Sequence, residues 1–224
     1  DPWWTPLPFS FPMPEKKIAL ITKIEGLKID PVISEELNRV AKNLENSGWI
    51  IEEPKAPNFQ EAANFQATLW LGEFRRTGGE AISKENDPDS NFIYSQMSRR
   101  CPDNSLEKFM DSLQQRARIS REWNKFFDKY PIILCPITGD IPFPDLKDLE
   151  SEESFDLVFD SMLPQIAPPY MGLPGLSFAT SQTKQNIPLG VQFISRKFRE
   201  DLLLNVAYDL EKYYPKIEPA LPSF

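Results

Sequence analysis

Short apolar runs alternate with amphipathic stretches along most of the chain. Five runs have the length of strands buried inside a sheet. They cover residues 18–21, 49–52, 132–135, 176–179 and 189–194. Apolar residues spaced three or four positions apart predict helices. These cover residues 31–47, 59–76, 105–129 and 200–213. Because helices and strands alternate, the pattern predicts an α/β fold in which helices cover a sheet.

The first of these units is a strand, a helix and a second strand joined by short connections. Asp30 and Pro31 have the residue types of a helix N-cap and a first helical position, and Gly48 ends the apolar period. The unit predicts two parallel strands joined by a right-handed crossover. Near the other end of the chain, a turn at Gln185–Asn186 joins the last two predicted strands. Residues 80–103 have no clean period, so no element is predicted there.

Proline is concentrated at the start of the chain, which holds several of its 22 prolines. Each proline fixes φ and removes a backbone donor, so this segment is neither a helix nor a central strand. The segment also carries large rings, which favour burial. They are Trp3, Trp4, Phe9 and Phe11. We therefore expect residues 1–16 to form an extended arm that packs against an α/β body made of residues 17–224.

Composition narrows the chemistry that this chain can perform. The 224 residues contain no histidine, which excludes Ser-His-Asp and Cys-His mechanisms and His-ligated metal sites built from this chain alone. With 25 basic and 33 acidic residues the net charge is -8, so a general attraction to nucleic acid or anionic membranes is disfavoured. No apolar run approaches the ~18 residues of a spanning helix. We expect a soluble chain with no nucleic acid and no membrane as a partner.

Two cysteines, Cys101 and Cys135, are too far apart in sequence for a zinc-ribbon pair and too few for a disulfide scaffold. A reducing, cytoplasmic setting is therefore expected. Cys135 ends an apolar run and precedes Pro136, which favours a buried thiol over a nucleophile, since no histidine is present to activate it. Cys101 lies in a polar stretch, so the two thiols should differ in solvent access and form no disulfide.

Charged side chains gather in two further places. Residues 145–160 hold seven acids and one base. A solvated loop that leads into a helix explains them better than a cation site, because the ordered spacing of an EF-hand is missing. The pairs Arg75–Arg76 and Arg99–Arg100 are able to hold a carboxylate or a phosphate. Solvent-exposed arginines without a ligand are the more common alternative.

Seven segments follow one another in an order that is typical of one protein family. They are DPWWTPLPF at residues 1–9, Leu44–Glu53, Phe126–Pro136, Ile141–Pro144, Met171–Ser177, Ile187–Ile194 and Arg199–Leu204. Together they resemble the C-terminal half of the amidase signature family. The resemblance implies a mixed β-sheet covered by helices. It also implies hydrolysis of amide carbon–nitrogen bonds by a lysine and two serines, without histidine, metal or cofactor.

The reactive residues of that family belong to a Gly/Ser-rich signature in its N-terminal half. This sequence has only 9 glycines and no Gly-Gly-Ser-Ser stretch. The resemblance therefore implies that both serines and the lysine are missing from this chain. In such enzymes this half supplies outer strands, covering helices and part of the acyl-side pocket for a small-molecule amide substrate. The N-terminal amidase half is then its partner, covalently joined or associated.

The resemblance also nominates residues for that pocket. The loop after residues 132–135 and the segment leading into Met171–Pro174 match pocket-lining regions of the family. The substrate-binding candidates are Thr138, Phe143, Met162, Gln165 and Ile166. Plain core packing explains Phe143, Met162 and Ile166 equally well, because apolar residues at these spacings need no ligand.

Two other positions bear on the pocket. Gln192 lies in the middle of a predicted strand, where a buried amide with satisfied hydrogen bonds is the favoured role. The family usually carries Asn shortly before its Gly-Leu-Pro, whereas this chain has Pro168, Pro169 and Tyr170. This departure affects the edge of the pocket and the choice of amide.

Two hypotheses from different classes follow. The chain is either the C-terminal portion of an amidase, inactive alone, or a stand-alone non-catalytic module that binds protein on the same scaffold. A start at Asp1 instead of Met, at a boundary internal to the family, favours the first. If part of the sheet is missing, residues 18–21 and 132–135 should lie at an open edge and promote association into a homo-oligomer.

Overall fold

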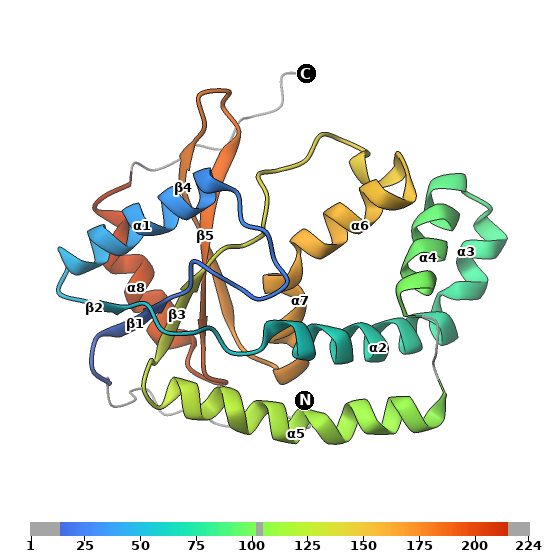
Figure 1. The fold of residues 1–224 in the computed structure, drawn as a ribbon, viewed down its shortest axis with the longest axis horizontal. Helices are drawn as coiled ribbons and strands as arrows, with labels where there is room; N and C mark the ends of the chain where they lie inside the picture. Colours follow the sequence, from blue (N-terminus) through green and yellow to red (C-terminus); the bar gives the residue numbers. More distant parts are fainter. Residues whose placement is uncertain (1–13, 102–104, 215–224) are drawn as a thin grey trace.

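The computed structural model describes residues 14–101 and 105–214. There the chain forms one sheet with the strand order β2-β1-β3-β5-β4 (Figure 1). The strands are β1 (Lys17–Leu20), β2 (Ile50–Glu52), β3 (Ile132–Cys135), β4 (Gly175–Gln182) and β5 (Pro188–Ser195). β1 is parallel to β2 and β3, whereas β5 is antiparallel to β3 and β4. The predicted α/β class and mixed sheet are confirmed.

The same part of the chain holds eight α-helices and one short 3-10 helix. They are α1 (Pro31–Glu45), α2 (Phe59–Thr77), α3 (Gly79–Glu85), α4 (Pro88–Arg100), α5 (Leu106–Phe127), η1 (Lys147–Leu149), α6 (Glu152–Ser161), α7 (Leu163–Met171) and α8 (Glu200–Glu211). The four helices that the apolar period predicts are confirmed. They are α1, α2, α5 and α8.

The predicted strand, helix and strand at the start of the body form a parallel unit. Asp30 caps α1, since its Oδ1 accepts a hydrogen bond from the backbone nitrogen of Val32 at 2.7 Å. Pro31 is the first helical residue, where its missing N–H has no helical partner to lose. β1 and β2 then pair in parallel register on one side of the sheet.

The sheet separates two apolar cores. Helices α1 and α8 cover one face, and α2, α5 and α7 cover the other (Figure 1). In β3, the side chains of Ile132 and Leu134 enter the first core, and those of Ile133 and Cys135 enter the second. All four are 0% exposed. Because strand side chains alternate between faces, burial on both faces requires an unbroken apolar run.

The strands at residues 18–21 and 132–135 do not lie at an open edge, so that prediction is wrong. β1 lies between β2 and β3, and β3 lies between β1 and β5. The edge strands of the described sheet are β2 and β4. Apolar runs identify buried strands but do not give their order, which here depends on the crossovers and on the β4–β5 hairpin folding back against β3.

Helices α3 and α4 occupy most of residues 80–103, where the apolar pattern predicts no element. The apolar period is missing because these two helices do not bury a row of apolar side chains. The buried residue of α3 is Gly79, and the buried residue of α4 is Gln96. A capping signal is nevertheless present. Asp87 accepts a backbone hydrogen bond at the start of α4, and Pro88 follows it. These are the residue types that begin α1.

Helix α7 is also absent from the prediction, since Pro168 and Pro169 lie inside it. Both lack the N–H that would bond one turn back. Burial holds this helix together instead, because Ala167 and Tyr170 are fully buried against the core of α2 and α5. The Tyr170 hydroxyl also donates a hydrogen bond to the backbone carbonyl of Ser112 in α5.

Most of the arm proposed for residues 1–16 lies outside the described residues. Residues 14–16 precede β1 and belong to no helix or strand. An arm that packs against the body stays a prediction. Among the helices of residues 14–101 and 105–214, none combines the length and the apolar composition needed to cross a membrane.

Candidate functional site

The loop that follows β3 lies at the carboxyl end of the parallel strands β1 and β3. In open α/β sheets, ligands bind in the crevice outside these strand ends. The loop carries Thr138 and Phe143, two of the five nominated residues. The loop after β1, residues 21–30, reaches the same end because the two strands pair in parallel. The sheet topology therefore places the candidate site at this end of the strands.

Gly139 fixes the loop after β3 to two neighbouring segments. Its carbonyl oxygen accepts a hydrogen bond from the backbone nitrogen of Asp30, and its own nitrogen donates to the carbonyl oxygen of Ser161, both at 2.8 Å. A Cβ atom at Gly139 would lie 2.5 Å from the carbonyl oxygen of Lys28. This approach leaves room only for glycine. The start of α1, the loop and the end of α6 are thereby held together.

A cavity of about 340 Å³ opens between these segments, and it is called the loop cavity below. Four of the five nominated residues line it, namely Thr138, Phe143, Met162 and Gln165. Gln165 is exposed, and the other three are half-buried. The apolar part of the wall includes Ile33, Ile137, Ile141, Val158 and Leu189. The structure thus brings together four residues from the two segments that the family resemblance nominates.

Ile166 is the exception, because it faces a second cavity of about 450 Å³. This cavity lies between α2, α4 and α7, and it is called the α2–α4 cavity below. Residues 158–166 contribute to both walls. Met162 and Gln165 line the loop cavity, whereas Leu163 and Ile166 line the α2–α4 cavity. The chain around the α6–α7 junction therefore separates the two spaces.

Ile33 of α1 and Leu189 of β5 also line the loop cavity, although the sequence pattern does not single them out. Both lie in correctly predicted elements, where apolar residues are expected to fill the core. In the sequence pattern, an apolar side chain that lines a cavity cannot be told apart from one that fills a core. Only the loop motif next to them points to a site.

The hydroxyl groups of the loop cavity bond to main-chain carbonyls. Thr138 Oγ1 donates to the carbonyl oxygen of Asp140 at 2.7 Å, and Ser161 Oγ donates to that of Val158 at 2.7 Å. Asp140 Oδ1 accepts from the backbone nitrogen of Ile141 at 3.0 Å. Neither hydroxyl donates to a side-chain base that would activate it as a nucleophile. The arrangement suits binding and shape more than covalent chemistry.

Cys135 is a buried thiol, as predicted. Burial raises the pKa of Cys135 to about 12, so its thiolate is scarce at neutral pH. Gln192 Nε2 donates to the carbonyl oxygen of Pro164 at 3.1 Å and lies 3.7 Å from Cys135 Sγ. The prediction of a buried Gln192 amide with satisfied hydrogen bonds is confirmed. Cys101 is half-buried, so the two thiols differ in access.

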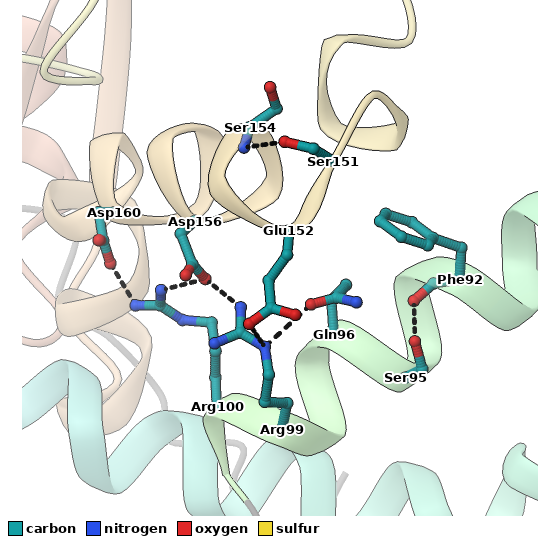
Figure 2. A network of polar contacts seen from close by, with 10 residues as sticks. All are labelled: Phe92, Ser95, Gln96, Arg99, Arg100, Ser151, Glu152, Ser154, Asp156 and Asp160. Carbon is teal, nitrogen blue, oxygen red and sulfur yellow. Dashed lines mark hydrogen bonds and ion pairs between the residues drawn. The ribbon is translucent and has the colours of Figure 1, made fainter.

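The acids of residues 145–160 lead through η1 into α6, as predicted, and several contact arginines (Figure 2). Asp156 Oδ1 lies 2.6 Å from Arg99 Nη2 and 2.7 Å from Arg100 Nη1. The hydrogen bond from Arg100 is the largest cause that holds the pKa of Asp156 below its ordinary value. Within the part of the chain that the structure describes, no group of three or more His, Cys, Asp or Glu is placed to hold a metal ion. The Arg99–Arg100 pair binds carboxylates of the chain itself.

Similar sequences are found among amide-processing proteins. The sequence model of the family described as Amidase matches residues 13–204. Indoleacetamide hydrolase of Bradyrhizobium diazoefficiens is 28% identical over 214 residues, which cover 94% of this chain and 41% of that protein. A glutamyl-tRNA(Gln) amidotransferase subunit of Gloeothece citriformis is 24% identical over 231 residues, which cover 92% of this chain and 47% of that protein. The chain spans less than half the length of these curated relatives.

Solved structures share the fold. 6-Aminohexanoate cyclic dimer hydrolase matches with a TM-score of 0.70 at 16% identity, over 89% of this chain and 45% of that chain. Fatty acid amide hydrolase matches with a TM-score of 0.67 at 16% identity, over 92% of this chain and 42% of that chain. Because the family match extends over most of the sequence, this chain belongs to the amidase family.

Proposed function

We propose that this chain is the C-terminal portion of an amide hydrolase and forms one wall of its substrate pocket. The observation that carries the proposal is the loop cavity, where Thr138, Phe143, Met162 and Gln165 meet at the carboxyl end of β3. The two serines and the lysine implied by the family resemblance would lie in a separate N-terminal portion. Since the hydroxyls of the loop cavity bond to main-chain carbonyls, this half contributes binding surface and sheet strands.

The loop cavity favours an amide with an apolar acyl group. Its wall is built mainly of aliphatic and aromatic side chains, and the carboxylate of Asp140 accepts a backbone hydrogen bond. Burying a ring of roughly 150 Å² would contribute about 4 kcal/mol at ~25 cal/mol per Å². Gln165, exposed in the wall, is a polar group available to the carboxamide. The similarity to a protein named indoleacetamide hydrolase supports an aryl-bearing acyl group.

Phe143→Ala tests the pocket in the enzyme assembled with its N-terminal portion. The variant should lower kcat/KM for an arylacetamide by roughly 10- to 100-fold, mainly through KM, because lost apolar burial weakens ground state and transition state alike. The effect on acetamide should be small, since acetamide has no ring to place in the loop cavity.

Ile166→Ala is the matched control, because it truncates a nominated residue that faces the α2–α4 cavity instead. Its effect on the arylacetamide should be much smaller than that of Phe143→Ala. Equal losses in the two variants would contradict the assignment of the substrate to the loop cavity.

The chain alone should hydrolyse no amide. A panel of simple aryl and aliphatic amides, assayed at high protein concentration, checks this expectation. Turnover that survives repurification and is abolished by mutating a serine within residues 1–224 would overturn the proposal. Sequencing the gene upstream of Asp1 distinguishes the alternative. An in-frame Ser-Ser-Lys signature supports the amidase portion, whereas its absence favours a stand-alone module that binds protein.

A further inference from the structure

Helices α3 and α4 form a pair at one end of the molecule, beyond the end of α2 and beside α6 (Figure 1). The pair contributes little to either core, since Gly79 and Gln96 are the buried residues of these two helices. The rings of Tyr94 and Phe74, with centroids 5.8 Å apart, join it to α2, and Arg75 Nη2 of α2 donates hydrogen bonds to the carbonyl oxygens of Ser98 and Cys101 at 3.2 and 2.6 Å. Apolar burial therefore contributes little to holding the pair against the body.

Ion pairs connect the end of α4 to α6 (Figure 2). Glu152, Asp156 and Asp160 are spaced four residues apart and share one face of α6. Arg99 Nε lies 3.1 Å from Glu152 Oε1, both arginines contact Asp156, and Arg100 also pairs with Asp160. These five residues are called the α4–α6 ion cluster. Their side chains are 25% to 58% exposed, so dissolved salt screens the cluster.

Cavities lie on two sides of α4. The α2–α4 cavity includes Arg100 and Asp160 in its wall. A further cavity of about 350 Å³ separates α4 from η1, and Ile93 and Leu149 lie on its two sides. Met97 lines both spaces. Close-packed side chains therefore do not join α4 to the body along these sides, in contrast to the helices that cover the sheet.

The pair is joined to α2 through two consecutive glycines. Gly78 ends α2, and Gly79 begins α3. A Cβ atom at Gly78 would lie 2.7 Å from the ring of Phe74, and one at Gly79 would lie 2.7 Å from the hydroxyl of Tyr94. Glycine permits this close turn and also gives the backbone its widest choice of φ and ψ. The junction has the properties of a hinge.

We propose that α3 and α4 are a hinged cap over the α2–α4 cavity and that the α4–α6 ion cluster keeps this cap closed. Opening separates Arg99 and Arg100 from α6 while the sheet and its two cores stay intact. The Arg100–Asp160 pair is part of the cavity wall, so breaking the pair widens the cavity. The cap does not depend on the substrate-pocket role proposed above, because it is argued from contacts within this chain.

Thiol labelling of the full chain tests the cap. Cys101 follows α4 and lines the covered cavity, whereas Cys135 in β3 is fully buried and serves as the internal control. Raising the salt from about 10 mM to about 1 M shortens the Debye length from about 30 Å to about 3 Å. A small maleimide should then label Cys101 faster, with no change at Cys135.

Asp156→Asn removes the charge that both arginines share. Cys101 in this variant should react roughly three- to ten-fold faster at low salt, and its rate should depend less on salt, because the pairs of Arg99 with Glu152 and of Arg100 with Asp160 remain. The control variant is Glu80→Gln, which removes one exposed charge paired with Lys84 on α3. Its Cys101 should react at the wild-type rate at every salt concentration.

Three outcomes decide against the cap. Equal Cys101 rates in the wild-type chain and in Asp156→Asn would show that the ion cluster does not hold α4. If the Cys101 labelling rate depends on salt in Asp156→Asn as it does in the wild-type chain, salt acts on the reagent or on the thiol itself and not on the ion cluster. Parallel acceleration of Cys135 would indicate opening of the whole fold. If circular dichroism shows that Asp156→Asn does not fold, the wild-type chain alone decides. The ratio of the Cys101 labelling rate to the Cys135 labelling rate should then rise with salt if the cap opens and stay constant if it does not.

Discussion

The sheet and the α4–α6 contact are held together by different forces. The four side chains of β3 are fully buried between two helical layers, whereas Arg99 and Asp156 meet while 37% and 32% exposed. Apolar burial contributes ~25 cal/mol per Å² and changes little with salt. Partly exposed ion pairs contribute about 0–1 kcal/mol each and are screened by salt. Conditions that loosen the α4–α6 contact should therefore leave the sheet unchanged.

The two thiols should show the largest contrast between these regions. The raised pKa of Cys135, about 12, leaves roughly one thiol in 10,000 ionised at pH 8. The reagent also reaches this residue only when the sheet opens. We expect Cys101 to be labelled at least roughly 1,000-fold faster in the native protein, as followed by mass spectrometry. Similar rates would contradict the burial of β3.

Ile133→Ala tests the sheet directly. The side chain is fully buried under α2, α5 and α7, so its truncation should lower the free energy of unfolding by about 2–5 kcal/mol. Urea titration followed by circular dichroism measures the change. Leu113→Ala on the outer side of α5, where the side chain is 45% exposed, is the control and should cost less than about 0.5 kcal/mol. Equal decreases in the free energy of unfolding in the two variants would contradict the placement of Ile133 in the core and Leu113 at the surface.

A polar contact inside the core sharpens the comparison. Tyr170→Phe removes the hydroxyl that bonds to the Ser112 carbonyl while keeping the ring, so unfolding should become easier by about 1–2 kcal/mol. Tyr208→Phe, at a largely exposed position of α8, should change stability by less than about 0.3 kcal/mol. If Tyr170→Phe lowers the free energy of unfolding no more than Tyr208→Phe does, the buried hydrogen bond to Ser112 does not stabilise the fold.

Acid should produce the smallest effect and confine it to the α4–α6 contact. The bond from Arg100, and then that from Arg99, lowers the pKa of Asp156 in the folded chain below the ordinary value of 3.8. The contact is therefore fully present above pH 3.8 and weakens as the pH falls through the lower folded value. The loss should stay below about 1 kcal/mol.

Hydrogen exchange of residues 88–100, corrected for the intrinsic effect of pH, checks the acid effect. Exchange there should rise as the pH falls below about 3.8, with β3 still protected. Asp156→Asn should exchange rapidly over the whole range. A pH dependence that persists in this variant would assign the effect to other carboxylates.

Much of the sheet is predictable because burial on both faces leaves an unbroken apolar run, as at Ile132–Cys135. Helix α1 is predictable for a second reason, since a cap at Asp30 and a buried stripe agree. Helix α4 has the cap without a stripe of buried apolar residues, because the residue it buries is Gln96. The strand order was not predictable, since β1 and β3 leave the same apolar signal at an edge or in the middle of a sheet.

The candidate site was predictable only in part. Motifs near residues 138–143 and 162–166 nominate positions along the chain, and the fold brings four of them to one cavity. Ile166 faces the other side because residues 158–166 turn through a helical junction, which the spacing of apolar residues does not reveal. Ile33 reaches the loop cavity from a distant helix, so no local pattern around it indicates the contact.

Gly139 has a consequence for how this cavity can diversify. Its hydrogen bonds to Asp30 and Ser161 join main-chain atoms, so they do not depend on which side chains line the space. Phe143 and Met162 can therefore change in size without disturbing the frame, whereas residue 139 must stay glycine. In directed evolution, a combinatorial library at the lining positions should yield many folded variants. Random changes at residue 139 should yield almost none.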